Sequence, residues 1–401
     1  MRSIPGRWVA VSVFVLSSTL NYLDRLLLAA LAPLLLAEFH MTQEDYGTVL
    51  MVFAITYAIS SPAAGILIDR FGLNRGISIA VGLWSLASIA TGFVGGIRSL
   101  IACRAVLGVA ESGGVPSAGK LTHAYLMPQE RALGAALSQI GLSIGSILAP
   151  PLGTWIALRY GWRSAFIFAG LLGFLWIPIW LFTSRRIPGA FAHEHVRPKQ
   201  PIGDLLGDVR LWGFVAASFL AMPAYTLWTN WTTLYLQRMH GASLVEANSL
   251  AGLPHFFGYF GGLAGGWLSM HWMNRGMPAL ASRRRACLVC AIALLSTGLV
   301  PLMPTAATAV IGMSVSFFAA SAWSVNLYTM PIDAFGGARA AFATSLLTSV
   351  YGLLQAVTSR SIGRVADLYG YAPVCVIFAI LPLAGYGILR LTAREPNQTK
   401  T

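Results

Sequence analysis

Residues 8–39 read WVAVSVFVLSSTLNYLDRLLLAALAPLLLAEF, an apolar run that is long enough to cross a bilayer but carries Asp24 and Arg25 at its middle. A second charged pair, Arg104 and Glu111, lies inside the fourth long apolar segment. A charge near the bilayer centre costs on the order of 3 kcal/mol, so such residues usually face a partner or an aqueous cavity. These four charges are therefore the first candidates for a functional site.

The rest of the composition is that of an integral membrane protein. Of the 401 residues, 56% are hydrophobic and only 10% are charged, and the mean hydropathy is +0.68. Soluble proteins carry about 25% charged residues. We expect an all-α membrane protein with two pseudo-symmetric six-helix bundles and about twelve transmembrane helices, centred near residues 22, 56, 84, 111, 143, 172, 223, 258, 293, 318, 351 and 382.

The amino-terminal segment Met1–Ser18 has the look of a signal peptide. Its apolar run continues to about Phe39 without a small-residue cleavage site, so we expect it to form the first transmembrane helix.

The net charge of +13 has a distribution that fits membrane orientation. If both termini are cytoplasmic, about 18 Lys and Arg residues fall in cytoplasmic segments, about 6 in external ones and about 3 within the membrane, as the positive-inside rule requires. We therefore expect a multi-pass protein of the cell (inner or plasma) membrane with both termini in the cytoplasm. A nucleic-acid partner is not needed to explain the charge.

The longest polar segment runs from about Ser184 to Arg210 and divides the apolar segments into six and six. This pattern predicts an amino-terminal bundle over 1–186, a cytoplasmic linker over 187–208 and a carboxy-terminal bundle over 209–401. We expect His193 and His195 in the linker to be solvated rather than to bind metal.

The four cysteines all fall in expected helices, and Cys287 and Cys290 form a CxxC pair. Metal sites need four ligands and redox motifs need an α/β setting, so a lone pair in an apolar helix indicates packing. The same holds for Cys103 and Cys375. No disulfide, metal or cofactor is expected.

The loop after the second helix contains Gly65, Asp69, Arg70, Gly72 and Arg75 in the order GILIDRFGLNR. Here the sequence resembles the major facilitator superfamily, whose signature at this loop is GxxxDRxGR and similar forms. The glycines allow close packing and a tight turn, and the resemblance implies that the three charged residues form a cytoplasmic gate. The alternative is an ordinary positively charged cytoplasmic loop. The corresponding loop of the second half, Gly265–Arg275, has Met270 at the acidic position, so we expect an asymmetric gate.

Asn21-Tyr22-Leu23-Asp24-Arg25 is similar to the NYxDR signature of the anion:cation symporter family within that superfamily. Further segments resemble its hexuronate-transporter branch: Asp45–Gly47, Arg104–Gly113, Pro116–Lys120, Glu130–Ala132, Ala149–Pro150, Tyr160–Arg163 and Trp323–Asp333. Helix 11, Ala343–Arg360, departs from the family pattern by having fewer glycines and by carrying Tyr351 and Gln355. Because helix 11 helps to line the cavity in this fold, the identity of the substrate stays open.

The spacing of the four charges predicts how they meet. Arg104 and Glu111 are seven residues apart and share a helix face, whereas Asp24 and Arg25 point about 100° apart. A cavity between helices 1 and 4 would let two acids and two bases compensate one another. The alternative is a purely structural ion-pair cluster.

The family resemblance implies a role for each of these residues. Asp24 and Glu111 would carry protons, Arg25 would bind the substrate carboxylate, and Arg104 would support Glu111 beside the substrate. Tyr57 on helix 2 could donate a hydrogen bond to a bound anion.

Other polar residues in helices are weaker candidates. Lys120 either snorkels to the membrane surface or takes part in the pathway. The candidates for substrate contact in the second half are uncharged: Trp323, Ser324, Asn326 and Thr329, and more weakly Trp228, Asn230, Trp231, Gln355 and His255. Their alternative role is packing and hydrogen bonding between helices.

These features together predict a monomeric, proton-coupled importer of an organic anion, a hexuronate or aldonate or else another mono- or dicarboxylate, working by alternating access. Its partners would be the small anion, protons and the lipid bilayer, and it would not be an enzyme. A proton-driven efflux antiporter is the main alternative, because residues 141–153 resemble the glycine-proline motif of drug exporters, with Ala149 in place of a glycine. No HExxH motif or nucleotide-binding loop supports a membrane enzyme.

Overall fold

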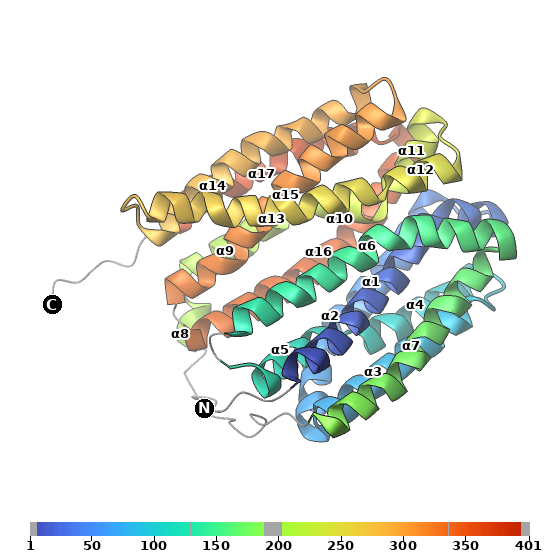
Figure 1. Cartoon of the computed structure of the whole chain (residues 1–401). Helices are drawn as coiled ribbons and strands as arrows, with labels where there is room; N and C mark the ends of the chain where they lie inside the picture. The colour runs from blue at the N-terminus through green and yellow to red at the C-terminus, as the bar shows by residue number, and fades with distance from the viewer. Residues whose placement is uncertain (1–5, 128–129, 188–202, 336, 394–401) are drawn as a thin grey trace. The chain divides into compact units, whose positions relative to one another are not determined.

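The computed structural model describes residues 6–127, 130–187, 203–335 and 337–393 and, within these ranges, omits a few side chains, among them that of Asp69. All of the regular secondary structure in the described ranges is helical, which confirms the all-α prediction. The chain forms two compact units (Figure 1). Unit 1 comprises Met1–Val196 and Leu244–Gly252, and unit 2 comprises Arg197–Ser243 and Leu253–Thr401.

The helices of unit 1 are long and mostly apolar. They are α1 (Arg7–Glu38), α2 (Gln43–Phe71), α3 (Leu73–Thr91), α4 (Ile97–Glu111), α5 (Gly114–Tyr125), α6 (Arg131–Tyr160), α7 (Trp162–Arg186) and the short α12 (Leu244–Leu250).

Unit 2 contains the remaining helices, several of them short. They are α8 (Gly203–Leu206), α9 (Val209–Ala221), α10 (Pro223–Asn230), α11 (Thr232–His240), α13 (Gly252–Met273), α14 (Ala279–Leu294), a 3₁₀ helix (Leu295–Leu302), α15 (Ala306–Phe335), α16 (Gly337–Tyr369) and α17 (Ala372–Thr392).

Nine helices within the described residues are long and apolar enough to cross a membrane. The three remaining expected spans, centred near residues 111, 258 and 351, coincide with α4 followed by α5, with α13 and with α16. A helix is therefore found at each of the twelve expected positions.

The fourth predicted helix is broken into α4 and α5 at Ser112 and Gly113. Pro116 has no N–H, so it cannot bond the carbonyl of Ser112 as a continuous helix requires. The two adjacent glycines, Gly113 and Gly114, further weaken helical structure here. The break leaves Glu111 as the last residue of α4.

Two glycines in unit 1 let helices touch backbone to backbone beside the four charged residues. A Cβ added at Gly145 of α6 would lie 2.9 Å from the main-chain nitrogen of Leu23, next to Asp24 on α1. A Cβ added at Gly108 of α4 would lie 2.6 Å from the carbonyl oxygen of Phe53 on α2. Helices α1 and α6 run side by side in unit 1 (Figure 1). The two glycine contacts fix the distance of the charged helices from their neighbours.

Gly108→Ala is expected to destabilise unit 1, because the added methyl group must push α4 away from α2. Overpacking of this kind costs typically about 1–3 kcal/mol. Thermal unfolding of the purified protein in detergent should show a lower Tm. The matched control is Gly387→Ala on α17, where an added Cβ meets no atom within 4 Å. An equal Tm for both variants would contradict the proposed close contact.

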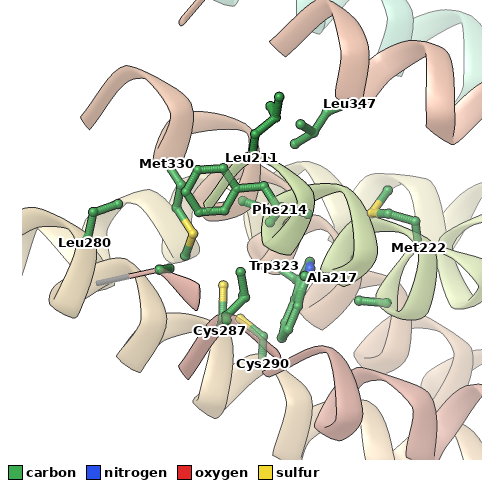
Figure 2. Close-up of a cluster of buried hydrophobic side chains, with 14 of the residues drawn as sticks. Leu211, Phe214, Ala217, Met222, Leu280, Cys287, Cys290, Trp323, Met330 and Leu347 are labelled. Carbon is green, nitrogen blue, oxygen red and sulfur yellow. The ribbon is translucent and has the colours of Figure 1, made fainter. Parts of the chain in front are cut away.

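The core of unit 2 is built from α9, α14, α15, α16 and α17 around Trp323, which is fully buried (Figure 2). Cys287 and Cys290 lie in this core, and all four cysteines of the chain are free thiols. The prediction that the CxxC pair serves packing is confirmed.

Candidate functional site

The structure brings together in unit 1 the four charges that the sequence places in helices 1 and 4. Asp24 is 3% exposed, Arg104 2% and Glu111 1%. Asp24 interacts electrostatically with Glu111, Arg104 and Arg25. We call Asp24, Arg25, Arg104 and Glu111 the charged cluster. Two acids and two bases share one desolvated region, so the cluster is neutral as a whole when all four are ionised.

The ion pair at the centre of the charged cluster joins Arg25 to Glu111. The guanidinium of Arg25 donates from Nε (3.0 Å) and from Nη2 (2.8 Å) to Oε2 of Glu111. Sequence reasoning expected Arg104, on the same face of helix 4, to support Glu111 instead. Arg104 and Glu111 are seven residues apart along α4. The residue that donates hydrogen bonds to Glu111 is Arg25, which comes from α1.

Three aromatic rings surround the guanidinium of Arg25. Its Cζ lies 5.0 Å from the ring centre of Tyr22, 4.9 Å from that of Phe53 and 5.0 Å from that of Tyr57. We call these three rings the aromatic cage. Cation–π attraction of this kind strengthens when the site is desolvated, so the aromatic cage holds the charge of Arg25 in place even when its acidic partner leaves.

Asp24 lies deeper, beside Ser88 of α3. Its Oδ1 accepts a hydrogen bond of 2.5 Å from the hydroxyl of Ser88. Its Oδ2 is buried and has no hydrogen-bond partner among the described residues. An ionised carboxylate normally accepts several hydrogen bonds, so this environment suits a carboxyl group that gains and loses a proton.

Arg104 packs its guanidinium 5.6 Å from the ring centre of Phe166. Its Nε and Nη2 are buried and have no hydrogen-bond partner among the described residues. Arg104 interacts electrostatically with both Asp24 and Glu111. It therefore balances the charge of both acids without a fixed ion pair to either.

A cavity of about 470 Å³ opens beside the charged cluster within unit 1. This volume is within the range of small-molecule sites, roughly 300–1,000 Å³. Arg25, Tyr57 and Glu111 line it, whereas Asp24 and Arg104 lie behind its lining residues. The remaining lining residues include polar side chains from α1, α5 and α6, namely Ser17, Ser18, Asn21, Thr122, Ser138 and Gln139.

Sequence reasoning assigned no role to several of the residues that shape this site. Tyr22 and Asn21 stand in the quoted signature beside Asp24, so their position in the motif could have suggested a role. Gln139 is a polar residue in an apolar segment, which is a usable signal. Ser88 and Phe53 carried no such signal, because a serine or a phenylalanine in a membrane helix is ordinary.

The predicted gate residues lie at the end of α2 and the start of α3. Arg70 and Arg75 are exposed, and the side chain of Asp69 lies outside the described part of the structure. Lys120 donates a hydrogen bond of 2.9 Å from Nζ to the carbonyl oxygen of Ile68 on α2. Lys120 thus ties α5 to the end of α2, one residue from Asp69.

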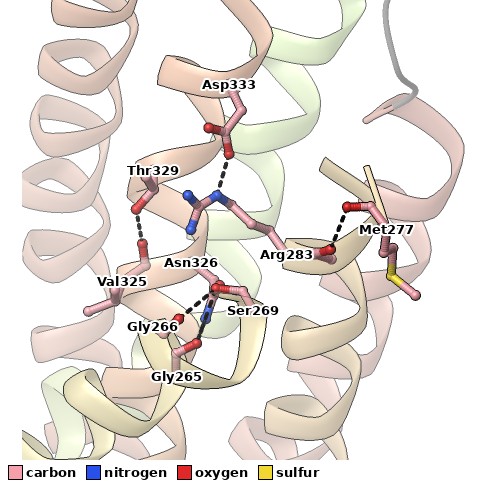
Figure 3. Close-up of polar contacts among 10 residues, drawn as sticks. Gly265, Gly266, Ser269, Met277, Arg283, Val325, Asn326, Thr329 and Asp333 are labelled. Carbon is pink, nitrogen blue, oxygen red and sulfur yellow. Dashed lines mark hydrogen bonds and ion pairs between the residues drawn. The ribbon is translucent and has the colours of Figure 1, made fainter. Parts of the chain in front are cut away.

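The polar candidates in unit 2 serve mainly to join helices (Figure 3). Asn326 is fully buried, and its Nδ2 donates to the carbonyl oxygens of Gly265 on α13 (2.9 Å) and of Ala322 (2.9 Å). The hydroxyl of Thr329 donates to the carbonyl of Val325 within α15. Trp323 lies in the hydrophobic core of unit 2. The alternative role of hydrogen bonding and packing between helices therefore describes Asn326 and Trp323 in this conformation, because both are shielded from solvent.

The remaining candidates of unit 2 are less deeply placed or also join helices. Ser324 and Gln355 are partly exposed. Trp228 is fully buried and donates from Nε1 to the hydroxyl of Ser316, 2.8 Å away. The ring of His255 lies 5.0 Å from that of Phe317. Asn230 and Trp231 are buried next to Trp228 at the junction of α10 with α11.

In unit 2 an ion pair joins α14 to α15. Met270 is 48% exposed on α13, and Arg283 on α14 forms an ion pair with Asp333 near the end of α15 (Figure 3). Met270 thus stands on α13 where an acidic residue was expected, and the ion pair between Arg283 and Asp333 joins two other helices of the same unit.

Two helical units with membrane-length helices and a charged, aromatic-lined cavity define a membrane transporter. The family model of the Major Facilitator Superfamily matches residues 14–359. The chain therefore belongs to the major facilitator superfamily, whose members are transporters and not enzymes.

Individual relatives support the same assignment. The chain is 28% identical to the hexuronate transporter of Escherichia coli K12 over 406 residues, covering 96% of this chain and 94% of that protein. It is 27% identical to the galacturonate transporter of Dickeya chrysanthemi over 281 residues, covering 66% of this chain and 81% of that one. Among solved structures, a bacterial homologue of the human lysosomal transporter Spinster has a TM-score of 0.75 at 20% identity, covering 98% and 96% of the two chains, which shows the shared fold.

Proposed function

We propose that this transporter imports a sugar acid, a hexuronate or an aldonate, together with protons by alternating access. Relatives named as hexuronate and galacturonate transporters support the substrate class. A cavity that combines one arginine with several hydroxyl and amide groups suits a carboxylate that carries a polyhydroxylated carbon chain. We further propose that both termini lie in the cytoplasm, that the protein works as a monomer in the cell membrane, and that protons are the coupling ion without any cofactor.

The observation that carries this proposal is the ion pair between Arg25 and Glu111 on the cavity surface. Glu111 occupies the Nε and Nη2 donors of the guanidinium. A substrate carboxylate that uses this edge of Arg25 must displace Glu111. A protonated Glu111 loses most of its attraction to Arg25, so protonation frees the guanidinium for the substrate. Binding of the anion and uptake of the proton then favour each other, which is the requirement for symport.

The energetics call for more than one proton. Moving a monovalent anion into a negative interior costs about 2.3 kcal/mol per 100 mV. One proton cancels the charge of the anion, and a second makes inward movement favoured by the voltage. Each pH unit adds about 1.4 kcal/mol per proton. Asp24 and Glu111 are the two acids of the charged cluster, and they supply these two positions.

The gate of this cycle would lie where α2 ends, with Asp69, Arg70 and Arg75. Lys120 joins α5 to this end of α2. A rearrangement of the gate would therefore also affect α5, the helix that follows Glu111.

Uptake by proteoliposomes tests the proposal. Purified protein is reconstituted, the outside is made acidic, and accumulation of labelled galacturonate, glucuronate and galactonate is followed. We expect uphill accumulation of at least one of these acids, and its loss when a protonophore removes the gradient. Accumulation that requires an alkaline exterior would instead favour the proton-driven efflux antiporter, and no pH dependence with any acid would overturn the proposal.

A further inference from the structure

Ser88 on α3 lies between two acceptors, and both are within hydrogen-bond distance of its hydroxyl. Its Oγ is 2.5 Å from Oδ1 of Asp24 on α1 and 3.0 Å from the carbonyl oxygen of Phe166 on α7. Ser88 is 1% exposed, so water does not compete freely for the hydroxyl. It is the one hydrogen-bond partner of Asp24 among the described residues.

A serine hydroxyl has a single proton and can donate to only one of these two acceptors at a time. When Asp24 is ionised, the carboxylate is the stronger acceptor, and the hydroxyl of Ser88 donates to it. When Asp24 is protonated, its own O–H can donate to Oγ of Ser88. The hydroxyl of Ser88 is then free to donate to the carbonyl of Phe166, so both distances become hydrogen bonds in one continuous chain.

We propose that Ser88 is a positioning residue that reports the protonation state of Asp24 to α7 by reversing its hydrogen bond. The inference rests on the proposed role of Asp24 as a proton carrier. The proton stays on Asp24 until it is released to the cytoplasm, and Ser88 only changes the direction of its donation, so no proton is gained or lost by the serine.

Close packing around Ser88 allows this change in hydrogen-bond direction to affect α7. A Cβ added at Gly170 of α7 would lie 2.5 Å from the carbonyl oxygen of Ser85, one turn before Ser88 on α3. Helices α3 and α7 therefore touch backbone to backbone beside Ser88. Phe166 also places its ring 5.6 Å from the guanidinium of Arg104. One residue of α7 thus meets Ser88 through its carbonyl and a member of the charged cluster through its ring.

The charged groups that face Asp24 are the other three members of the charged cluster: Arg25 on α1, and Arg104 and Glu111 on α4. Those three set the charge around Asp24, whereas Ser88 supplies the hydrogen bond. Because hydrogen bonds to an ionised group are roughly twice as strong as those to a neutral one, removing the hydroxyl disfavours the ionised form of Asp24 more than the protonated form.

The test compares Ser88→Ala with the matched control Ser85→Ala. Ser85 lies one turn away on the same helix, is fully buried against α7, and its hydroxyl has no hydrogen-bond partner among the described residues. Exchange of labelled for unlabelled galacturonate is measured in proteoliposomes with equal pH on both sides over a range of pH. We expect Ser88→Ala to move the midpoint of the pH profile upward by about one pH unit, and Ser85→Ala to leave it unchanged.

Ser88→Cys keeps the size of the side chain but has a weaker donor, so its midpoint should move in the same direction by less. If Ser88→Ala does not fold, Ser88→Cys carries the test. Infrared difference spectra between high and low pH add a second readout. The carbonyl band of protonated Asp24, identified by its loss in Asp24→Asn, should shift in frequency in Ser88→Ala but not in Ser85→Ala.

Each contrary outcome has a separate meaning. An unchanged pH profile and an unchanged Asp24 band in the Ser88 variants would overturn the proposed reversal of the Ser88 hydrogen bond. In that case the proposed function would still hold if the wild-type protein shows pH-driven uptake. Equal shifts in Ser88→Ala and Ser85→Ala would show a general effect of packing and would also overturn the reversal. A wild-type protein without pH dependence would remove the proposed function and the reversal together.

Discussion

Glu111→Gln is expected to abolish uphill uptake driven by a pH gradient while keeping exchange of labelled for unlabelled substrate. Glutamine has the shape of a protonated glutamate and cannot ionise, so it cannot form the ion pair with Arg25. The guanidinium then stays available to the substrate at every pH. In the wild type, the empty carrier would return with Glu111 ionised, having released its proton. A variant that cannot ionise at this position still exchanges substrate, but it cannot use the proton gradient. The measurement is accumulation and exchange in the same proteoliposomes.

The matched control is Glu130→Gln, in the same unit but outside the cavity. Glu130 accepts hydrogen bonds from Nε (3.0 Å) and Nη2 (2.5 Å) of Arg7. These hydrogen bonds hold the pKa of Glu130 below its usual range, so it stays ionised at neutral pH. The pair of Arg7 and Glu130 lies outside the cavity and the charged cluster, so this variant should accumulate substrate normally. Normal pH-driven accumulation by Glu111→Gln would exclude Glu111 from the coupling mechanism.

Asp24→Asn should be at least as damaging to pH-driven accumulation, because it removes one of the two acids.

Arg25→Lys is expected to weaken substrate affinity by roughly 10- to 100-fold, and Arg25→Ala to eliminate measurable binding. A guanidinium offers two parallel donors that match a carboxylate, whereas an ammonium offers a point charge. A hydrogen bond to a charged group contributes about 1.5–3 kcal/mol, which sets the expected factor for losing one. The planar guanidinium also sits within the aromatic cage, and lysine fills that space less well. Calorimetric titration with the sugar acid that gives uptake measures both variants.

Arg104→Lys is the comparison for this experiment. Arg104 lies behind the lining residues of the cavity, with its guanidinium against Phe166. It balances the charge of both acids, so its replacement should impair pH-driven accumulation more than affinity. If Arg104→Lys loses binding while Arg25→Lys retains it, the two arginines have been assigned to the wrong roles.

The fold could be predicted from the sequence because membrane insertion is governed by local composition. Each helix must satisfy its own backbone hydrogen bonds in the bilayer, so an apolar segment of sufficient length specifies a helix wherever it occurs. The four buried charges could be found for the same reason, since each stands out against an apolar segment. The interruptions of these helices were less predictable, although Pro116 explains the break between α4 and α5 and Pro223 begins α10.

The pairing within the charged cluster depends on tertiary packing. Spacing along α4 suggested Arg104 as the partner of Glu111, but the hydrogen bonds come from Arg25 across the space between two helices. Helix spacing tells which residues share a face and says nothing of how closely another helix approaches that face. Such distances depend on contacts elsewhere in the unit, as at Gly108, where α4 meets the backbone of α2, and at Gly145, where α6 meets that of α1.

Tertiary contacts separate polar residues that the sequence does not tell apart. Asn326 and Gln139 are both amides in apolar helices, yet Asn326 bonds a carbonyl of α13 and Gln139 lines the cavity. Ser88 has no distinguishing feature in the sequence, and it acquires one only because α1 and α7 bring a carboxylate and a carbonyl to the same hydroxyl. Local composition therefore specifies the helices and their buried charges, while the partner of each polar group follows from which helices pack together, because hydrogen bonds act over only about 3 Å.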